Sequence, residues 1–458
     1  MQPAASPVEE AMTSALAARA GPGSAGVRAT FECADLYLLP ARLGAIAPFM
    51  PQVGWSDSAD AGERWLALGE IDSIGAPAGA GFDAAFETLA RAHERLKVFS
   101  ALAPEPGVVR YVGGLAFDPR QVANPAWPDG GAARFVLPRV LIREKNGRAE
   151  ATVLGTPAND ARALIARLER AARETFDAAA PVHVAEAILP GARARWSEAV
   201  GEALRAIGAG TVRKVVLSRD IVLEAARAID PWELLRLIHG RDPHGLRFCL
   251  RFDGQSAFVG ASPERLLSQR GAAVACDCLA GTIARGADPQ AEARNAATLL
   301  ASDKDGREHR IVLEEILAAI KPHVRSLESP AAPCILALPE VQHLWSPIRA
   351  QLREGVGLGE LVGSLHPTPA VGGSPRLPAM DLIRALEGRP RGWYAGLVGW
   401  VAPEESEFAV AIRSGIVRGS RMTAFGGAGI VRGSDAGAEW DETARKAASF
   451  INLFAERA

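Results

Sequence analysis

Short apolar runs separated by turn-forming residues dominate the first part of the chain. Such runs lie at 65–68, 108–117 and 134–142. Runs of this length bounded by glycine and proline are typical of β-strands, whereas apolar residues at helical spacing over 82–102 predict a helix. We therefore expect residues 27–195 to form a strand-rich N-terminal half.

The second part of the chain, residues 196–458, alternates predicted helices with predicted strands. Helical spacing is found at 196–207, 231–241 and about 290–320, and strand-like alternation at 212–219, 246–252, 256–260 and 408–413. Ser302 and Asp305 resemble a capping box, so a second helix is expected to begin there. Because this part has no internal repeats and no long linker, it should be one compact unit that also packs with residues 27–195.

The remaining segment, residues 1–26, is rich in Ala, Gly, Ser and Pro. Such a composition predicts a mobile leader. It has neither a basic start nor an apolar stretch of the kind that signal peptides carry, and nowhere in the chain do about 18 uncharged apolar residues run together. These patterns predict a cytoplasmic protein without a membrane partner.

The composition is that of an ordinary globular protein. Hydrophobic residues make up 48% of the 458 residues, charged residues 23%, and the formal net charge is -2. This balance excludes wholesale disorder, and because the basic residues are spread along the chain, nucleic acid is not an expected partner. The chain shows no heptads and no separate apolar stripe, so the sequence predicts no particular oligomeric state.

The five cysteines give no sign of a disulfide framework or a structural zinc site, because they are scattered and form no CxxC pair. Cys276 and Cys278 alternate along a predicted strand and should share one face as small buried side chains. His343, His366 and Cys276 lack partners that would define a metal site or a catalytic triad, so core or turn positions are expected for them.

A glycine-rich segment near the C-terminus precedes a predicted helix. The segment 426–429 reads as a loop whose backbone N–H groups would form an anion cradle, and on the helix Glu439, Glu442 and Lys446 would share one face. The alternative is a tight turn followed by acids that complement the helix dipole. No Walker or Rossmann spacing accompanies the glycines, so ATP and NAD are not indicated.

A second acidic pair, Asp305 and Glu308, occupies the same i, i+3 spacing on the helix that begins at Ser302. Two facing helices of this kind would supply an oxygen-only site suited to Mg²⁺, which binds few carboxylates and keeps several waters. Here too the alternative is simple complementation of the helix dipole by acids in the first turn.

Three further residues are candidates for chemistry. Lys214 lies among Val and Leu in a predicted strand, where burial would make its amine available as a general base; the alternative is a lysine at a sheet edge or one whose ammonium group reaches solvent. Glu264 follows Ser-Pro at a strand end, where partial burial would make it a general acid; the alternative is a surface turn. Arg413 shares a predicted strand face with two alanines, which would leave space for a carboxylate ligand.

Seven motifs occur in one order between residue 196 and the C-terminus. They are Lys214-Val-Val-Leu-Ser-Arg219, Gly260-Ala-Ser-Pro-Glu264, Leu279-Ala-Gly-Thr282, Val341-Gln-His-Leu344, Leu365-His-Pro-Thr-Pro369, Trp393-Tyr-Ala-Gly396 and Gly427-Ala-Gly-Ile-Val431. Together they closely resemble the chorismate-utilising enzymes and, within that family, its isochorismate synthases. The likeness over the first half of the chain is looser.

The resemblance implies one α/β (α+β) unit, a large, mostly antiparallel β-sandwich flanked by helices, with chorismate and Mg²⁺ in a central cleft. Lys214 would activate water for attack at C2 of chorismate, and Glu264 would protonate the departing C4 hydroxyl. Glu308 and Glu442 would bind the metal, with Asp305 and Glu439 just outside the ligands. The substrate would contact Gly281, Thr282, Tyr394, Arg413, Gly427, Ala428, Gly429 and Lys446.

Within the family, Lys214 indicates water as the nucleophile, because the similar anthranilate synthases carry glutamine there. Ala280 argues against aminodeoxychorismate synthase, which has a nucleophilic lysine at the matching position. The expected activity is therefore Mg²⁺-dependent isochorismate synthesis. Salicylate synthase, which also eliminates pyruvate, and a non-catalytic protein that binds chorismate or a metal remain as alternatives. The sequence leaves open whether the product enters menaquinone, siderophore or salicylate synthesis.

Overall fold

The structure is a computed structural model. It describes residues 26–33, 35–43, 49–56, 63–101, 109–121, 127, 131–174, 184–187, 191–241, 245–338 and 341–455. The leader predicted for residues 1–26 lies outside these residues, except for Gly26.

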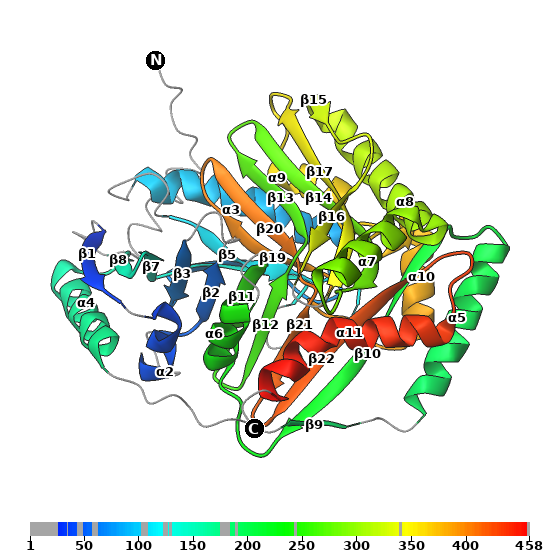
Figure 1. Cartoon of the computed structure of the whole chain (residues 1–458). Coiled ribbons are helices and arrows are strands. Elements are labelled where there is room, and N and C mark those ends of the chain that lie inside the picture. The colour runs from blue at the N-terminus through cyan, green and yellow to red at the C-terminus, as the bar shows by residue number, and fades with distance from the viewer. Residues whose placement is uncertain are drawn as a thin grey trace.

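Two antiparallel β-sheets make up the centre of the molecule (Figure 1). Within the described residues, sheet A has twelve strands and sheet B has ten. Sheet A has the order β1 (Val27–Glu32), β8 (Arg148–Val153), β7 (Val140–Lys145), β3 (Arg64–Leu68), β2 (Gln52–Ser56), β11 (Leu246–Arg251), β12 (Ser256–Ser262), β21 (Ser414–Arg418), β22 (Arg421–Ile430), β10 (Lys214–Ala225) and β18 (Gly373–Ser374), with β9 (Val184–Ala187) on β10. Sheet B has the order β15 (Val324–Glu328), β17 (Val341–Leu352), β14 (Ala273–Ala284), β13 (Arg265–Arg270), β20 (Glu405–Val410), β19 (Leu397–Val401), β5 (Tyr111–Leu115), β6 (Ala133–Leu137) and β4 (Asp72–Ala76), with β16 (Cys334–Ala337) on β17.

Strands from the two halves of the chain share both sheets. In sheet A, β2 from the N-terminal half pairs with β11, and in sheet B, β5 pairs with β19. Residue 195 therefore does not separate two independent cores.

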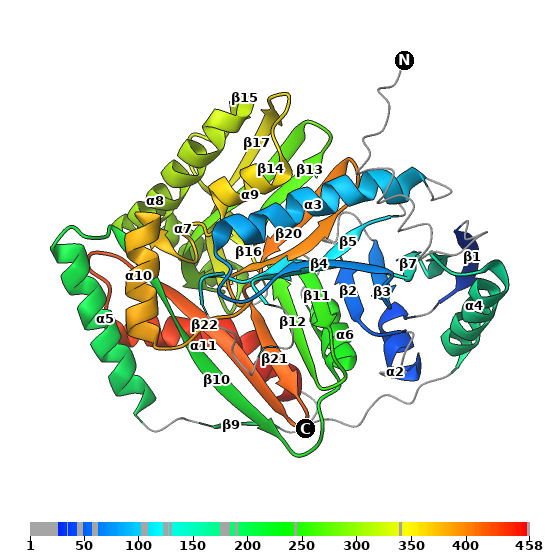
Figure 2. The same cartoon turned by 180° about the vertical axis from the view of Figure 1, so that it is seen from behind.

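Helices flank the two sheets (Figures 1 and 2). They are α2 (Leu39–Leu43), which follows the 3₁₀ turn η1 (Leu36–Leu38), α3 (Phe82–Ala101), α4 (Ala158–Arg173), α5 (Ala192–Gly208), α6 (Pro231–Arg241), α7 (Pro289–Ala301), α8 (Asp303–Ile320), which leads into the turn η2 (Lys321–His323), α9 (Leu358–Leu365), α10 (Arg376–Glu387) and α11 (Ala436–Ala455). For the site, two contacts matter most: α8 packs on β14 and α11 packs on β22. None of the described helices combines the length and the apolar character that a membrane-spanning helix needs.

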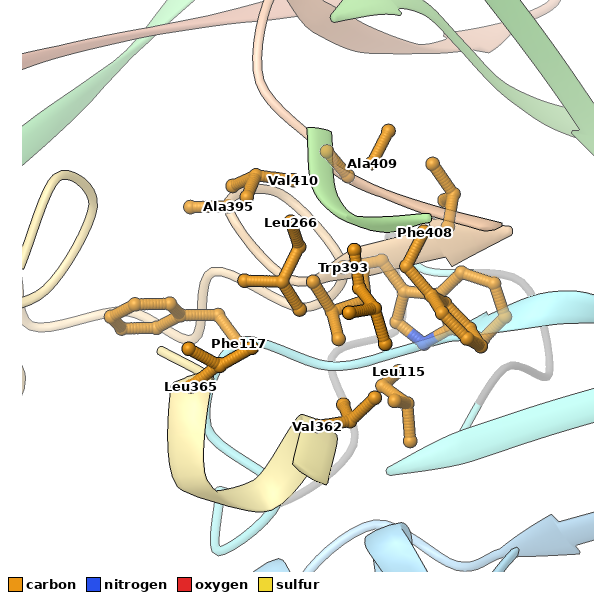
Figure 3. Packing of buried hydrophobic residues seen from close by; sticks show 14 of the residues in the cluster. Leu115, Phe117, Leu266, Val362, Leu365, Trp393, Ala395, Phe408, Ala409 and Val410 are labelled. Carbon is orange, nitrogen blue, oxygen red and sulfur yellow. The ribbon is translucent and has the colours of Figure 1, made fainter. Parts of the chain in front are cut away.

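The hydrophobic core follows the period-two alternation of the strands. In β12, Phe258 belongs to a cluster shared by both sheets, whereas its neighbour Val259 belongs to a second cluster on the other face of sheet A, under α4 and α6. Figure 3 shows part of the shared cluster, where Val362 of α9 lies beside Leu115 and Leu365 lies beside Phe117. Each such apolar side chain contributes about 1.5–3 kcal/mol when it is fully buried, so the helices are held to the sheets mainly by this packing.

The fold class expected from the sequence, a mostly antiparallel sandwich flanked by helices, is confirmed. Ser302 caps α8 as predicted, since its hydroxyl accepts a hydrogen bond from the Asp305 N–H. Cys276 and Cys278 are buried on β14, as expected.

Two strand predictions are wrong. The apolar run 134–142 is not one strand, because Pro138 has no N–H for a ladder and divides it into β6 of sheet B and β7 of sheet A. The strand predicted for 408–413 ends at Val410, and Arg413 has a left-handed backbone with φ 49°.

Candidate active site

A cavity of about 70 Å³, enough for several water-sized groups, is lined by residues of both sheets, of α8 and of α11. Nine residues that the sequence had singled out line it: Glu264, Gly281, Thr282, Glu308, Tyr394, Arg413, Gly427, Gly429 and Lys446. Five others do not line the cavity: Lys214, Asp305, Ala428, Glu439 and Glu442.

Lys214 is the first residue of β10 and is completely buried. Its Nζ lies 3.0 Å from Oε1 of Glu308 on α8, so it faces the cavity wall although it does not line the cavity. The sheet-edge alternative for Lys214 is therefore wrong. An amine without solvent contact that lies against one carboxylate is a suitable candidate for proton transfer.

Glu264 lies between β12 and β13 and is 2% exposed. Burial raises its pKa to about 8, with a further rise from Asp277, while the positive charge of Lys214 opposes the shift. The Thr368 hydroxyl donates to Oε1 of Glu264 at 3.4 Å and orients it. The surface-turn alternative is wrong, and a carboxyl that keeps its proton near neutral pH is able to act as an acid.

The segment 426–429 is not a loop. It lies within β22 and pairs with β10, with Gly429 opposite Val216 and Gly427 opposite Ser218. The glycine content predicts a turn, but here the missing side chains make space for neighbours. A Cβ on Gly429 would lie 2.2 Å from Oε1 of Glu308, and a Cβ on Gly427 would lie 2.8 Å from the Tyr394 hydroxyl.

The backbone of this part of β22 is still suited to contact a ligand. The pairing with β21 ends at Ala424, so from Phe425 onward only β10 is a strand neighbour of β22. From Phe425 onward, the edge of β22 that faces away from β10 has no strand partner in the described part of the chain. The predicted substrate contacts of Gly427, Ala428 and Gly429 through their amides stay predictions.

The acids predicted to bind metal lie on α8 and α11, as expected, and each is paired with a lysine. The pairs are Lys214 with Glu308 at 3.0 Å, Lys304 with Glu439 at 2.7 Å and Lys446 with Glu442 at 2.7 Å. Burial by itself would raise the pKa of Glu442, but the adjacent Lys446 holds it below its usual value. Burial, together with the charge of Glu442, raises the pKa of Glu439.

This donor set fits a hard divalent cation, although no three acidic, His or Cys side chains of the described residues are arranged as a metal cluster. Burial lowers the pKa of Lys304, but Glu439, Glu442 and Glu308 together raise it above the usual value, which shows that all three carboxylates act on one ammonium group. They offer only oxygen donors, the type that Mg²⁺ takes. The Asp305 carboxylate instead accepts the hydroxyl of Ser302 at the start of α8.

Arg413 reaches the cavity from the left-handed position after β20 and contacts a histidine. Its Nη2 lies 3.3 Å from Nε2 of His343, whose Nδ1 is 3.0 Å from Oγ1 of Thr282 and 3.3 Å from the Gly281 carbonyl. Burial, and then the charge of Arg413, holds the pKa of His343 well below 6.5. The imidazole is therefore neutral, so Nε2 accepts from Arg413 while Nδ1–H is turned toward Thr282 and Gly281.

His343 is the functional candidate that sequence reasoning missed, since a core or turn role was expected. It lines the cavity because β17 pairs with β14 in a register that sets His343 opposite Thr282. The register shifts between Leu279 and Thr282, and Gly281 there has φ 84°, a conformation that favours glycine. No pattern in the sequence reports that register.

Tyr394 completes the wall of the cavity. Its ring stacks on Phe425 of β22 with 4.7 Å between the centroids, and burial raises its pKa to about 12. Lys446 of α11 donates to the Gly427 carbonyl at 2.9 Å. The cavity therefore joins fixed cations, Arg413 and Lys446, to a neutral phenol, a combination that suits an anionic ring compound.

Comparisons with known proteins all point to one family. A family model described as "Chorismate binding enzyme" matches residues 41–454. The chain is 37% identical over 361 residues to the salicylate biosynthesis isochorismate synthase of Pseudomonas aeruginosa, covering 76% of this chain and 74% of that protein. It is 34% identical over 349 residues to the isochorismate synthase MenF of Bacillus subtilis, covering 74% and 73%.

Among solved structures, the menaquinone-specific isochorismate synthase MenF of Escherichia coli superimposes with a TM-score of 0.75 at 27% identity. The superposition covers 98% of this chain and 99% of that one. The match therefore extends over both sheets of this chain. The chain belongs to the chorismate-binding enzyme family.

Proposed function

We propose that the protein is an isochorismate synthase that converts chorismate reversibly to isochorismate and requires Mg²⁺. The observation that carries the proposal is that buried Glu264 lines the cavity, where its raised pKa suits an acid, while buried Lys214 contacts the cavity-lining Glu308. The names of the two curated relatives and of the solved structure support the same activity.

In the proposed reaction, the neutral amine of Lys214 accepts a proton from water and becomes an ammonium group as the water oxygen bonds to C2 of chorismate. Glu264 gives its proton to the C4 hydroxyl, which leaves as water while the ring double bonds shift. The proton count balances, since Lys214 gains one proton from the attacking water and Glu264 gives one proton to the departing hydroxyl. Reversal requires only that the two groups exchange roles.

Substrate binding falls to the residues around the two groups. Arg413, held by neutral His343, would bind a carboxylate, and Tyr394 and Thr282 offer hydroxyl groups at the cavity wall. Glu308 and Glu442 would hold Mg²⁺, with Glu439 and Asp305 beside them. When bound, Mg²⁺ supplies a positive charge that neutralises a substrate carboxylate.

The test is to incubate the purified protein with chorismate and Mg²⁺ and to separate the products. Isochorismate is the expected product, and chelation by EDTA should abolish its formation until Mg²⁺ is restored. Failure to form isochorismate at any protein concentration would refute the proposal. Salicylate and pyruvate in place of isochorismate would assign the protein as a salicylate synthase, and chorismate binding without turnover would assign it as a binding protein.

A variant separates the role of Lys214 from substrate binding. Lys214→Ala should lower kcat by about 10²-fold or more, as loss of a general base does. The affinity for chorismate, measured by calorimetry, should stay close to that of the wild type. Unchanged turnover would contradict the assignment of Lys214 as the base.

A further inference from the structure

Lys304 lies in the first turn of α8 and bridges to α11. Its Nζ is 2.7 Å from Oε1 of Glu439, a residue only 1% exposed. Lys304 itself remains 33% exposed at its side chain, so it reaches the acids from the solvent side.

The other two lysines of the acidic face are bound more firmly into the site. Lys214 has no exposure, and Lys446 is fixed between the Glu442 carboxylate and the Gly427 carbonyl. Lys304 forms an ion pair with Glu439, and its partly exposed side chain has a path to solvent. Of these three lysines it is the one that can leave without disturbing the cavity.

The carboxylates around Lys304 need a cation. Glu439 and Glu442 are close enough for the charge of Glu442 to act on Glu439, and Glu308 acts on the same ammonium group from α8. Like charges in a partly desolvated site repel one another unless a cation lies among them. Lys304 provides that cation from within the chain.

We propose that Lys304 is a built-in counter-cation that competes with Mg²⁺ for the carboxylates of α8 and α11 and so sets the metal affinity of the enzyme. The choice of Mg²⁺ as the competitor rests on the proposed function. In the absence of a divalent ion Lys304 keeps the acids together, and when the ion binds, the ammonium group gives up its contact with Glu439 and turns to solvent.

The test is a calorimetric titration of the full chain with MgCl₂, without chorismate. Lys304→Met keeps the length and apolar character of the side chain and removes the charge, so Mg²⁺ should bind about tenfold more tightly, because a unit charge near the site no longer competes. Lys321→Met, at the exposed far end of α8, is the matched control and should leave the Kd unchanged. Lys304→Gln serves if the Met variant does not fold.

Thermal unfolding gives a second readout that needs no activity. In EDTA, Lys304→Met should unfold at a lower temperature than the wild type, because buried Glu439 loses its counter-cation, and saturating Mg²⁺ should close that gap. An unchanged or weaker Mg²⁺ affinity in Lys304→Met, a gap that Mg²⁺ does not close, or no Mg²⁺ binding by either protein would overturn the proposal.

The two proposals fail separately. If the wild type forms isochorismate but Lys304→Met has the wild-type Kd for Mg²⁺, only the role of Lys304 is refuted. If Lys304→Met binds Mg²⁺ more tightly but the wild type forms no isochorismate, the counter-cation stands and the activity is refuted.

Discussion

Gly429 is the residue at which a single added methyl group would separate Lys214 from Glu308. A Cβ added at Gly429 would lie 2.2 Å from Oε1 of Glu308 and 3.0 Å from Cε of Lys214. The carboxylate is the far end of a flexible side chain, so it can move aside at little cost in stability, but the ion pair is lost.

We therefore expect Gly429→Ala to lower kcat/KM at least about tenfold, since misplacement of a reacting group by about 1 Å is enough to do so. The midpoint of urea unfolding should change little. Gly208→Ala, at a helical glycine with open space around it, is the control and should keep full activity. A Gly429→Ala enzyme with normal kcat/KM would show that the Lys214–Glu308 contact is dispensable.

The pH dependence should report Glu264. Its pKa of about 8 means that the carboxyl holds its proton below that pH and loses it above. As an acid it works only in the protonated form, so kcat/KM should fall as the pH rises through about 8, by about tenfold for each further pH unit.

This limb of the profile is measured as kcat/KM for chorismate between pH 6 and 10 on the wild type and on Glu264→Gln. The variant should have low activity without that limb. If the limb persists in Glu264→Gln, another group is responsible for it.

At the residue scale, the sequence indicated which side chains are candidates for chemistry but not which of them are buried. Lys214 and Glu264 were predicted to be base and acid, each beside an exposed alternative, and only their burial inside the fold excludes the exposed alternative. Their catalytic roles stay predictions. His343 was missed because the contact with Arg413 depends on a strand register and on a left-handed residue, neither of which has a sequence signal.

At the scale of elements, a buried ion pair joins the end of α10 to β10. Glu387 accepts the Ser218 N–H at 2.7 Å and Nε of Arg391 at 2.9 Å. Arg391 also donates to the Val371 carbonyl at 2.8 Å and to the Val216 carbonyl at 2.7 Å. These bonds tie β10, and with it Lys214, to the turn that carries Tyr394.

Glu387→Ala would leave the buried Arg391 without its carboxylate, which costs about 3–5 kcal/mol. We expect the free energy of unfolding in urea to fall by that amount. Glu202→Ala removes a glutamate from the exposed pair with Arg205 and should cause no measurable change. Equal stabilities of the two variants would mean that the Glu387 pair does not hold β10 in place.

Element prediction succeeded where local chemistry decides and failed where packing does. The capping residue Ser302 sets the start of α8, and the period of apolar residues matches α6 over its full length. The glycines of β22 were read as a loop, because glycine favours turns locally. In the fold this strand needs glycine, because the side chains of Glu308 and Tyr394, which come from other segments, occupy the space beside Gly429 and Gly427.

At the scale of the whole molecule, the two halves of the chain depend on each other for sheet pairing. A fragment of residues 191–458 would lose β2 from the side of β11 and β5 from the side of β19, leaving two unpaired edges. Unpaired edges promote aggregation. We expect this fragment to be insoluble or to aggregate on size exclusion, whereas the full chain elutes as a folded species.

A monomeric fragment with cooperative unfolding would contradict this prediction. The sandwich class was available from the resemblance of the second half to a family. The pairing of strands from the two halves could not be predicted, because strand pairing across more than a hundred residues leaves no local pattern in the sequence.

The cavity draws its lining from β10, β14, β17, β22, α8 and α11, which are distant in sequence and meet only when both sheets have formed. Contacts of such separation are slow to form, because a long loop must close first. A partly folded chain therefore has no place for the substrate. Because a ligand of this cavity binds only the finished protein, it shifts the folding equilibrium toward that state in proportion to its concentration, so the supply of substrate helps to set how much active enzyme persists.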